Sequence, residues 1–179
     1  DNRLARFRVV LVGGAEFPLE LRRETEARGI VALASYGLTE TCSQVATQSP
    51  QVPRDGCSLD SGRALDGAEL RILDGRIQVR GPMSMRGYVG ATALLRDEFF
   101  TTGDLGHIDE TGRLFVLGRA DDMIVTGGEN VHPVEIERAL SKCRYVKHAL
   151  CFGVTDARWG EIVAVALVLD STSRDVAAL

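Results

Sequence analysis

Tyr36-Gly37-Leu38-Thr39-Glu40 follows a short apolar run at residues 30–34, which we predict to be a β-strand. At the end of such a strand, a tyrosine can stack on a flat base and a threonine hydroxyl can bond a phosphate oxygen. A glycine lets the backbone approach a ligand closely, and a glutamate offers the oxygen ligands that Mg²⁺ prefers. A strand end with a surface acid is the alternative, and these five residues alone leave the two interpretations even.

The sequence before this stretch predicts a strand–helix–strand unit. Residues 9–12 form a β-branched run that stops at two glycines, which indicates a buried strand. A helix is predicted over residues 18–28, because a proline stands at its start and a glycine follows its end. Strands joined through a helix pair in parallel, and ligands bind at the carboxyl ends of such strands. We therefore expect residues 13–15 to lie beside the stretch that begins at Ser35.

The middle of the chain predicts β-structure. Residues 69–73 and 76–80 alternate between apolar and polar types around Asp74-Gly75, which is a strong signal for a β-hairpin. A further strand is predicted at residues 114–117, after a turn at residues 109–112. This region is predicted to form a small β-barrel or sheet with few helices.

The last third of the chain predicts a small α+β unit. A strand at residues 123–125 and a loop at residues 126–130 precede a helix that opens at Pro133. The helix has one face at i, i+3, i+4 and i+7 that we predict to be buried. That face consists of Ile136, Ala139, Leu140 and Cys143. The remaining predicted elements are strands at residues 149–154 and 162–169 and a helix that starts within residues 173–179.

The composition is that of a globular protein, with 45% hydrophobic and 26% charged residues. The formal net charge of -4 does not indicate a basic surface for nucleic acid. The cysteines (Cys42, Cys57, Cys143, Cys151) and the three histidines lack zinc-ligand spacing, so we expect free thiols in a reducing cytoplasm. The longest apolar run, at residues 162–169, is too short to span a bilayer, and the first residues lack the apolar core of a signal peptide.

Three further motifs are weak when each is taken alone. Asp104 in Thr-Gly-Asp can accept hydrogen bonds from both hydroxyls of a ribose, although Thr-Gly-Asp is also common in β-turns. Arg119 can reach ribose or phosphate oxygens, and the alternative is a solvated turn. The pair Gly127-Gly128 lets a loop pass close to a ligand, and the alternative is a routine strand-to-helix connection.

Together and in this order, the motifs resemble the adenylate-forming superfamily of acyl- and aryl-CoA synthetases, luciferases and peptide-synthetase adenylation domains. The resemblance covers nearly the whole chain, and chance explains one such motif but not six in sequence. It implies that residues 1–120 are the carboxyl-terminal part of the large adenylate-binding domain and that residues 121–179 are a truncated small, mobile α+β domain. The motifs are Gly13-Gly14-Ala15, residues 36–40, Gly81-Pro82 with Gly87-Tyr88, Thr102-Gly103-Asp104, Gly118-Arg119, and Gly128-Glu129-Asn130 with residues 133–137.

The resemblance also implies roles for individual residues. Thr39 would contact the α-phosphate of ATP and Glu40 would bind Mg²⁺, which makes these two the implied catalytic residues. The small domain would rotate about the hinge residue Asp121, and Gly128 would lie on the loop that faces the pantetheine tunnel of coenzyme A. The adenine of ATP or AMP would be lined by Gly14, Ala15, Ser35, Tyr36 and Gly37, and the ribose would be held by Asp104 and Arg119. A further match, Asp156 with Trp159-Gly160-Glu161, is interpreted as a turn packed by one tryptophan.

Within the superfamily, residues 36–47 resemble the o-succinylbenzoate–CoA ligases of menaquinone biosynthesis, and the short Asp74-Gly75 hairpin suits those compact enzymes. The resemblance would place Thr41, Ser43 and Gln44 near the acyl substrate, because hydroxyls and an amide suit a dicarboxylic aromatic acid. A helix cap with a solvated face is an equally good interpretation of these three residues.

Two catalytic elements of the superfamily are not in the sequence. The phosphate loop with its lysine would precede Gly13, and the lysine that supports adenylation would follow Leu179. Lys142 and Lys147 are the only lysines, and both stand too early. We therefore expect a fragment, inactive alone, of a ligase that uses a carboxylic acid, ATP, Mg²⁺ and coenzyme A.

Three alternatives stay open at this point. The parent can be another acyl- or aryl-CoA ligase, or a peptide-synthetase adenylation domain. The chain can also be a non-catalytic domain that binds a nucleotide or a partner. We expect neither nucleic acid nor membrane as a partner, and the sequence leaves a homo-oligomer open.

Overall fold

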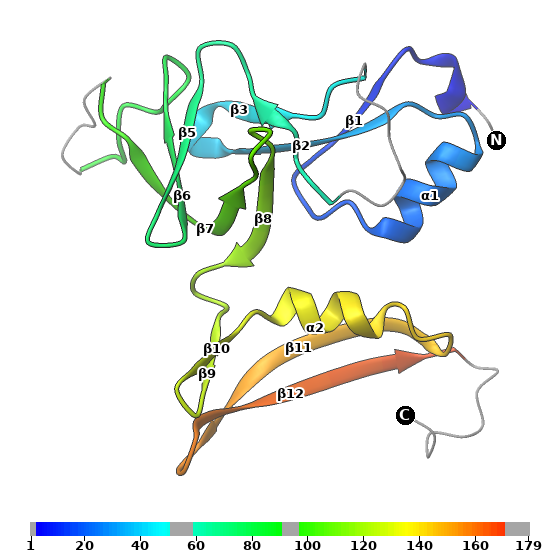
Figure 1. The fold of residues 1–179 in the computed structure, drawn as a ribbon, viewed down its shortest axis with the longest axis vertical. Helices are drawn as coiled ribbons and strands as arrows, with labels where there is room; N and C mark the ends of the chain where they lie inside the picture. Colours follow the sequence, from blue (N-terminus) through cyan, green and yellow to red (C-terminus); the bar gives the residue numbers. More distant parts are fainter. Residues whose placement is uncertain (1–2, 51–58, 91–96, 171–179) are drawn as a thin grey trace. The chain divides into compact units, whose positions relative to one another are not determined.

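The computed structural model describes residues 3–50, 59–90 and 97–170, and the chain divides into two compact units, Asp1–Val116 and Leu117–Leu179 (Figure 1). The described residues form a mixed α/β structure that is mostly strand, with two α-helices. The predicted domain boundary, 1–120 against 121–179, concerns a longer enzyme and stays a prediction. The helix predicted within residues 173–179 and the thiol of Cys57 lie outside the described residues. None of the described helices has the length and apolar character needed to cross a membrane.

The first unit holds two sheets, with strand orders β1-β2-β3-β4 and β5-β6-β7-β8. Its helices are the 3-10 turns η1 (Arg3–Arg6) and η2 (Thr39–Thr41) and the α-helix α1 (Leu19–Ala27). Its strands are β1 (Val10–Val12), β2 (Ala32–Leu38), β3 (Ser43–Thr47), β4 (Arg63–Ala64), β5 (Glu69–Leu73), β6 (Arg76–Arg80) and β7 (Phe100–Ile108). Strand β8 (Leu114–Arg119) begins in the first unit and ends in the second.

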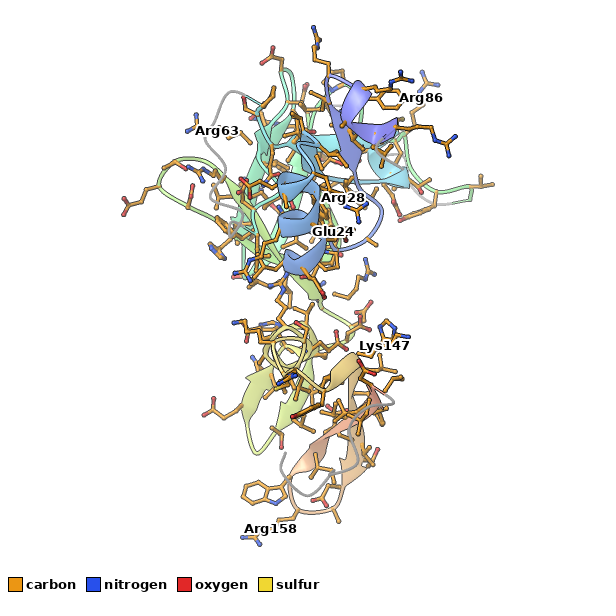
Figure 2. The ribbon with its side chains drawn as sticks, turned by 90° about the vertical axis from the view of Figure 1, so that its right-hand side faces the viewer. Glu24, Arg28, Arg63, Arg86, Lys147 and Arg158 are labelled. Carbon is orange, nitrogen blue, oxygen red and sulfur yellow. The ribbon has the colours of Figure 1, made fainter. Side chains whose placement is uncertain are left out.

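The predicted strand–helix–strand unit is confirmed. Strand β1 pairs in parallel with β2, and α1 connects them. Glu24 on α1 and Arg28, which directly follows the helix, form an exposed ion pair (Figure 2). The prediction that β1 is buried is wrong, because Leu11 is 52% exposed. Side chains alternate along a strand, so Val10 and Val12 pack against the buried cluster around Phe17 while Leu11 faces the other way.

Strand β2 is longer than the prediction of residues 30–34, because it continues through Leu38. It pairs antiparallel with β3, which the sequence did not predict, and the register shifts between Tyr36 and Gly37. A Cβ atom at Gly37 would lie 2.0 Å from the carbonyl oxygen of Ser43, so only glycine fits this close approach. Between the strands, Cys42 takes a left-handed conformation with φ 59°. Residues 36–38 therefore belong to a bulged hairpin.

The hairpin predicted at Asp74-Gly75 is confirmed. Strands β5 and β6 pair antiparallel with Leu73 opposite Arg76. Asp74 and Gly75 both have positive φ, 50° and 74°, as a two-residue hairpin turn of type I′ requires. Strands β5 to β8 form a sheet of four, and the small barrel stays a prediction. A buried cluster joins this sheet to the other through Tyr36, Val45, Ala46, Ile77, Val79 and Leu114.

The second unit is one antiparallel sheet, of order β10-β9-β12-β11, with one helix. Its elements are β9 (Ile124–Thr126), β10 (Glu129–Val131), α2 (Pro133–Leu140), β11 (Val146–Asp156) and β12 (Gly160–Leu169). Helix α2 opens at the predicted proline. Its predicted buried face is wrong in part, because Ala139 is exposed and the other three residues are half-buried. The helix packs mainly on β11, where the Cys151 amide donates to Glu137, so one sheet covers only part of the helix.

The predicted loop at residues 126–130 is wrong in part, because Thr126 ends β9 and Glu129 begins β10, which leaves Gly127 and Gly128 as the tip of the hairpin. The tip contacts the turn that precedes β12. The amide of Gly127 donates to the carbonyl oxygen of Trp159 at 2.9 Å, and a Cβ atom at Gly127 would lie 2.8 Å from the Trp159 ring. Asp156 accepts hydrogen bonds from the amides of Arg158 and Trp159, which confirms the interpretation of this motif as a turn.

Candidate functional site

Two residues predicted for different parts of a nucleotide meet in the first unit. The hydroxyl of Tyr36 on β2 donates to Oδ2 of Asp104 on β7 at 2.7 Å, although 68 positions separate them. The amide of Asp104 donates to Oγ1 of Thr102, and the hydroxyl of Thr102 donates to the carbonyl oxygen of Ile77. Thr102 is 2% exposed and Ile77 fully buried, so the segment that carries Asp104 is fixed from inside the core.

Glu40 lies beside a second predicted motif. It is half-buried in η2, and the hydroxyl of Tyr88 donates to its Oε1 at 2.7 Å. The amide of Met85 donates to the backbone carbonyl of Glu40 at 2.7 Å. The segment with Gly87-Tyr88 therefore lies along η2, so motifs that were separate in the sequence meet at this carboxylate.

The residues predicted near an acyl substrate have different surroundings. Thr41 is 1% exposed, and its hydroxyl lies within hydrogen-bond distance of the backbone of Leu38 and Ser43. It therefore caps the η2 turn, as in the alternative interpretation. On β3, Ser43 is exposed and Gln44 half-buried. Thr39 is exposed. As contacts to an acyl group or a phosphate, these four residues stay predictions.

The end of β1 lies beside Ser35, as predicted from parallel pairing, because Val12 is opposite Ala34, although β2 itself continues to Leu38. The hydroxyl of Ser35 donates to the carbonyl oxygen of Val12 at 3.2 Å. A Cβ atom at Gly13 would lie 2.6 Å from Oγ of Ser35, so this glycine permits the approach. The next residue, Gly14, has φ +82°, and Ala15 is exposed. The segment predicted to line an adenine thus lies next to Ser35.

Three predicted residues belong to the second unit. Arg119 and Asp121 form an exposed ion pair, with Nη2 3.6 Å from Oδ2. Gly128 lies at the tip of the β9–β10 hairpin with φ +88°. An arginine and the predicted hinge residue therefore contact each other within that unit.

Sequence reasoning missed two supporting residues. The hydrogen bond from the Asp104 amide to the Thr102 hydroxyl could have been predicted from the local sequence. Ser and Thr hydroxyls often bond the backbone amide two residues further along the chain. The contact of Tyr88 with Glu40 spans 48 positions, and no local pattern predicts it.

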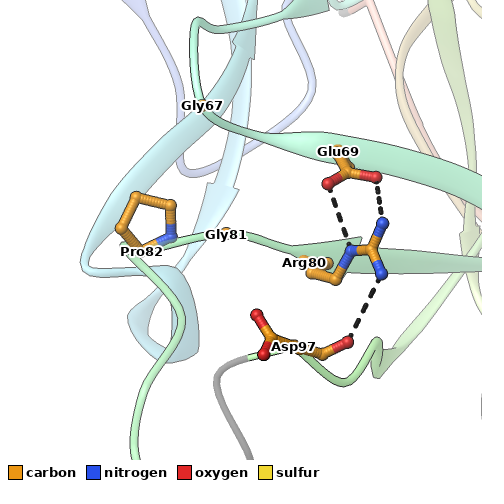
Figure 3. Close-up of a pocket in the computed structure, with 6 residues that line it drawn as sticks. All are labelled: Gly67, Glu69, Arg80, Gly81, Pro82 and Asp97. Carbon is orange, nitrogen blue, oxygen red and sulfur yellow. Dashed lines mark hydrogen bonds and ion pairs between the residues drawn. The ribbon is translucent and has the colours of Figure 1, made fainter.

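The first unit also has a pocket of about 450 Å³ at the Gly81-Pro82 motif (Figure 3). Inside it, the guanidinium of Arg80 makes an ion pair with Glu69 and donates to the backbone oxygen of Asp97. The pocket is lined by Gly67, Glu69, Arg80, Gly81, Pro82 and Asp97, which include none of the predicted site residues. Its main charges are paired with each other, so it is not the candidate site.

The chain is similar to known proteins over most of its length. The family model of AMP-binding enzymes matches residues 1–89. The 2-succinylbenzoate–CoA ligase of Bacillus pumilus is 41% identical over 177 residues, which cover 91% of this chain and 36% of the relative. The same enzyme of Bacillus subtilis is 36% identical, with 90% and 36% covered. The chain therefore spans little more than a third of the length of these relatives.

Solved structures are also similar to nearly the whole of this chain, which again covers little more than a third of each. The o-succinylbenzoate CoA synthetase (MenE) of Bacillus subtilis, in complex with the acyl-adenylate OSB-AMP, has a TM-score of 0.81 at 35% identity and matches 93% of this chain and 37% of its own. ATP-bound MatB from Rhodopseudomonas palustris has a TM-score of 0.84 at 33% identity, with 94% and 36% covered. The chain belongs to the AMP-binding enzymes, and its similarity to 2-succinylbenzoate–CoA ligases extends over nearly all of its length.

Proposed function

We propose that the chain is part of an ATP-dependent acid–CoA ligase that acts on o-succinylbenzoate in menaquinone biosynthesis. The contact of Tyr36 with Asp104 carries the proposal, because the predicted adenine and ribose residues meet there from distant parts of the chain. The similarity to 2-succinylbenzoate–CoA ligases supports the acid, since both names denote one compound. A cytoplasmic location follows from the ATP and CoA that the reaction consumes.

The proposed nucleotide site lies in the first unit. The Asp104 carboxylate accepts hydrogen bonds from the ribose hydroxyls, and an ionised acceptor makes such bonds stronger. Thr39 contacts the α-phosphate from η2, where its exposed side chain is accessible. Arg119 is assigned to the ribose by the family resemblance alone. The adenine is lined by Gly14, Ala15, Ser35, Tyr36 and Gly37.

Glu40 is the proposed ligand for Mg²⁺. Its carboxylate has the oxygen chemistry that this ion requires, and the hydrogen bond from Tyr88 orients it. Among the described residues there is no group of three or more His, Cys, Asp or Glu that could hold a metal. A magnesium site built from one protein carboxylate and substrate phosphates needs no such group. When bound, the ion would offset the negative charge of the phosphates.

The second unit belongs, in this proposal, to the small domain that turns between the two half-reactions. Asp121 is the hinge, and the tip of the β9–β10 hairpin brings Gly128 to the pantetheine of CoA. The positive φ of Gly128 supports a tip in which glycine is favoured, because other residues would be strained in this backbone conformation. Residues 1–120 then form the end of the large adenylate-binding domain.

The proposed reaction has two steps. The carboxylate of the acid attacks the α-phosphorus of ATP, and the bond to the leaving pyrophosphate breaks to give an acyl-AMP. The CoA thiolate then attacks the acyl carbon, and AMP leaves with the electron pair of the broken bond. The residues of this chain supply position and electrostatic stabilisation and no nucleophile. Thr41, Ser43 and Gln44 are placed near the acid only by the resemblance.

The test uses the complete protein that contains this chain, with o-succinylbenzoate, ATP, Mg²⁺ and CoA. We expect AMP and the acyl-CoA thioester in equal amounts, measured by chromatography, and neither without the acid. The variant Glu40→Gln is expected to slow AMP formation about 100-fold, as losses of charge-stabilising groups do. Glu110→Gln is the matched control, because Glu110 is an exposed carboxylate in the turn after β7. No AMP from this acid would overturn the substrate assignment.

A second candidate is a ligase for another acid. The TM-score to ATP-bound MatB, 0.84, is as high as that to the o-succinylbenzoate enzyme, 0.81, so the fold does not choose the acid. The same assay with a panel of carboxylic acids separates these candidates. Binding of AMP without turnover of any acid would instead favour a non-catalytic nucleotide-binding domain.

A further inference from the structure

The family resemblance assigns a role to the ring of Tyr36, next to the adenine, and assigns none to its hydroxyl. Stacking on a base needs an open ring face, yet Tyr36 is only 8% exposed and packs in the cluster with Val45 and Ile77. Its hydroxyl leaves this apolar cluster and donates to Oδ2 of Asp104 at 2.7 Å. The polar end of Tyr36 therefore has a defined partner in the proposed ribose site.

The Asp104 carboxylate is held at both ends of its side chain. At the backbone end, its amide donates to Thr102, which is itself bonded to Ile77. At the carboxylate end, the final torsion of an aspartate is broad and roughly two-fold, so it needs an external contact to fix it. The Tyr36 hydroxyl supplies that contact from a ring that the core holds rigidly.

A fixed carboxylate matters more for binding a ribose, which offers two hydroxyls, than for binding a ligand with one hydroxyl. The two hydroxyls of the sugar are neighbours and point to one carboxylate, so both hydrogen bonds form only in one orientation of its plane. A carboxylate has about four acceptor positions, of which the Tyr36 bond uses one and a sugar diol two. Orienting the carboxylate before binding avoids the entropy cost of ordering it in the complex.

We propose that Tyr36 is a positioning residue whose hydroxyl orients Asp104 for both hydroxyls of a ribose, and that this contact makes the site prefer ribonucleotides over deoxyribonucleotides. The proposal rests on the proposed function, because it takes Asp104 as the ribose ligand. It adds that sugar selection depends on a residue that does not itself need to touch the sugar.

The experiment titrates this chain with AMP, 2′-deoxy-AMP and 3′-deoxy-AMP and follows amide shifts by NMR. AMP carries the adenine, ribose and α-phosphate but no β- or γ-phosphate, so contacts to a triphosphate do not enter the comparison. We expect the wild-type chain to bind AMP about tenfold more tightly than either deoxynucleotide, the effect of one hydrogen bond to a charged acceptor. In Tyr36→Phe the ratio falls to about two, because AMP loses more affinity than either deoxynucleotide. Tyr145→Phe, a tyrosine of the second unit, keeps the full ratio.

The variant Asp104→Asn separates this inference from the proposed function. If the wild-type chain does not prefer AMP and Asp104→Asn does not change its binding, the proposed ribose site itself fails. If Asp104→Asn abolishes the preference but Tyr36→Phe keeps it in full, only the role of Tyr36 is overturned. A uniform loss of affinity for all three nucleotides in Tyr36→Phe would also overturn it, because that is the result of a purely structural role.

A second measurement does not depend on a folded Tyr36 variant. Tyrosines labelled with fluorine report on their own surroundings by ¹⁹F NMR. Replacing Asp104 by Asn changes the charge of the group that the Tyr36 hydroxyl contacts, so the Tyr36 resonance is expected to shift while that of Tyr145 stays. An unchanged Tyr36 resonance would show that the contact does not form in solution.

Discussion

The substitution Thr41→Val tests whether the hydroxyl of Thr41 holds the η2 turn. Valine keeps the shape of threonine, and the side chain is 1% exposed, so the change removes the hydroxyl and little else. That hydroxyl accepts from the Leu38 amide at 3.2 Å and lies 2.8 Å from the Ser43 carbonyl oxygen, to which it can donate. Removing it leaves the Leu38 amide without this acceptor. A buried donor that loses its partner costs about 1–3 kcal/mol.

Amide hydrogen exchange is the assay, because it resolves the strands on both sides of the turn. In the regime where exchange follows the opening equilibrium, a loss of about 2 kcal/mol accelerates exchange in β2 and β3 about 30-fold. The control is Thr41→Ser, which keeps the hydroxyl and removes one methyl group at a cost near 1 kcal/mol. Exchange in Thr41→Val within about twofold of wild type, or a larger effect for serine than for valine, would refute the reasoning.

Three further predictions rest on described contacts or burial, and a fourth rests on the sequence. Gly37→Ala would place its Cβ 2.0 Å from the Ser43 carbonyl oxygen, so we expect a loss of at least about 2 kcal/mol in urea unfolding; near-wild-type stability would contradict the bulge geometry. Hydrogen bonds from its own turn hold the pKa of Asp109 below its ordinary value. The ionised carboxylate therefore stabilises the turn fully above about pH 4, and this stabilisation is lost as the pH falls through the lower pKa of the folded state. An NMR titration of Asp109 that gives an ordinary pKa would contradict this. Burial raises the pKa of the Cys151 thiol, so at pH 8 a thiol reagent should modify it more slowly than exposed Cys42, and equal rates by mass spectrometry would count against its burial. Calorimetry of this chain with ATP should detect no binding tighter than micromolar, because the sequence holds no lysine-bearing phosphate loop; sub-micromolar binding would disprove that.

Local signals predicted the local structure. The Asp74-Gly75 hairpin followed from two residues that tolerate positive φ between alternating strands. The parallel pairing of β1 with β2 followed from the helix between them. The exposure of Leu11 was missed because a short apolar run does not reveal whether both faces of its strand are covered.

Local sequence patterns could not predict the contacts between segments that are distant in the chain. The β2–β3 hairpin depends on the close approach of Gly37 to Ser43, and a glycine in a sequence is equally common at a turn. The site residues were chosen through the family resemblance, and the structure adds which of them meet. Tyr36 contacts Asp104 across 68 positions, and Tyr88 contacts Glu40 across 48.

The packing of Gly127 against Trp159 makes two short segments of the second unit mutually dependent. A side chain at position 127 would need the space of the indole ring, and a small residue at position 159 would leave the hairpin tip without that neighbour. In an alignment of related sequences, the two positions should covary, with a larger residue at one accompanied by a smaller residue at the other. A transplant of the β9–β10 tip from one relative to another should therefore succeed only when residue 159 is transferred with it.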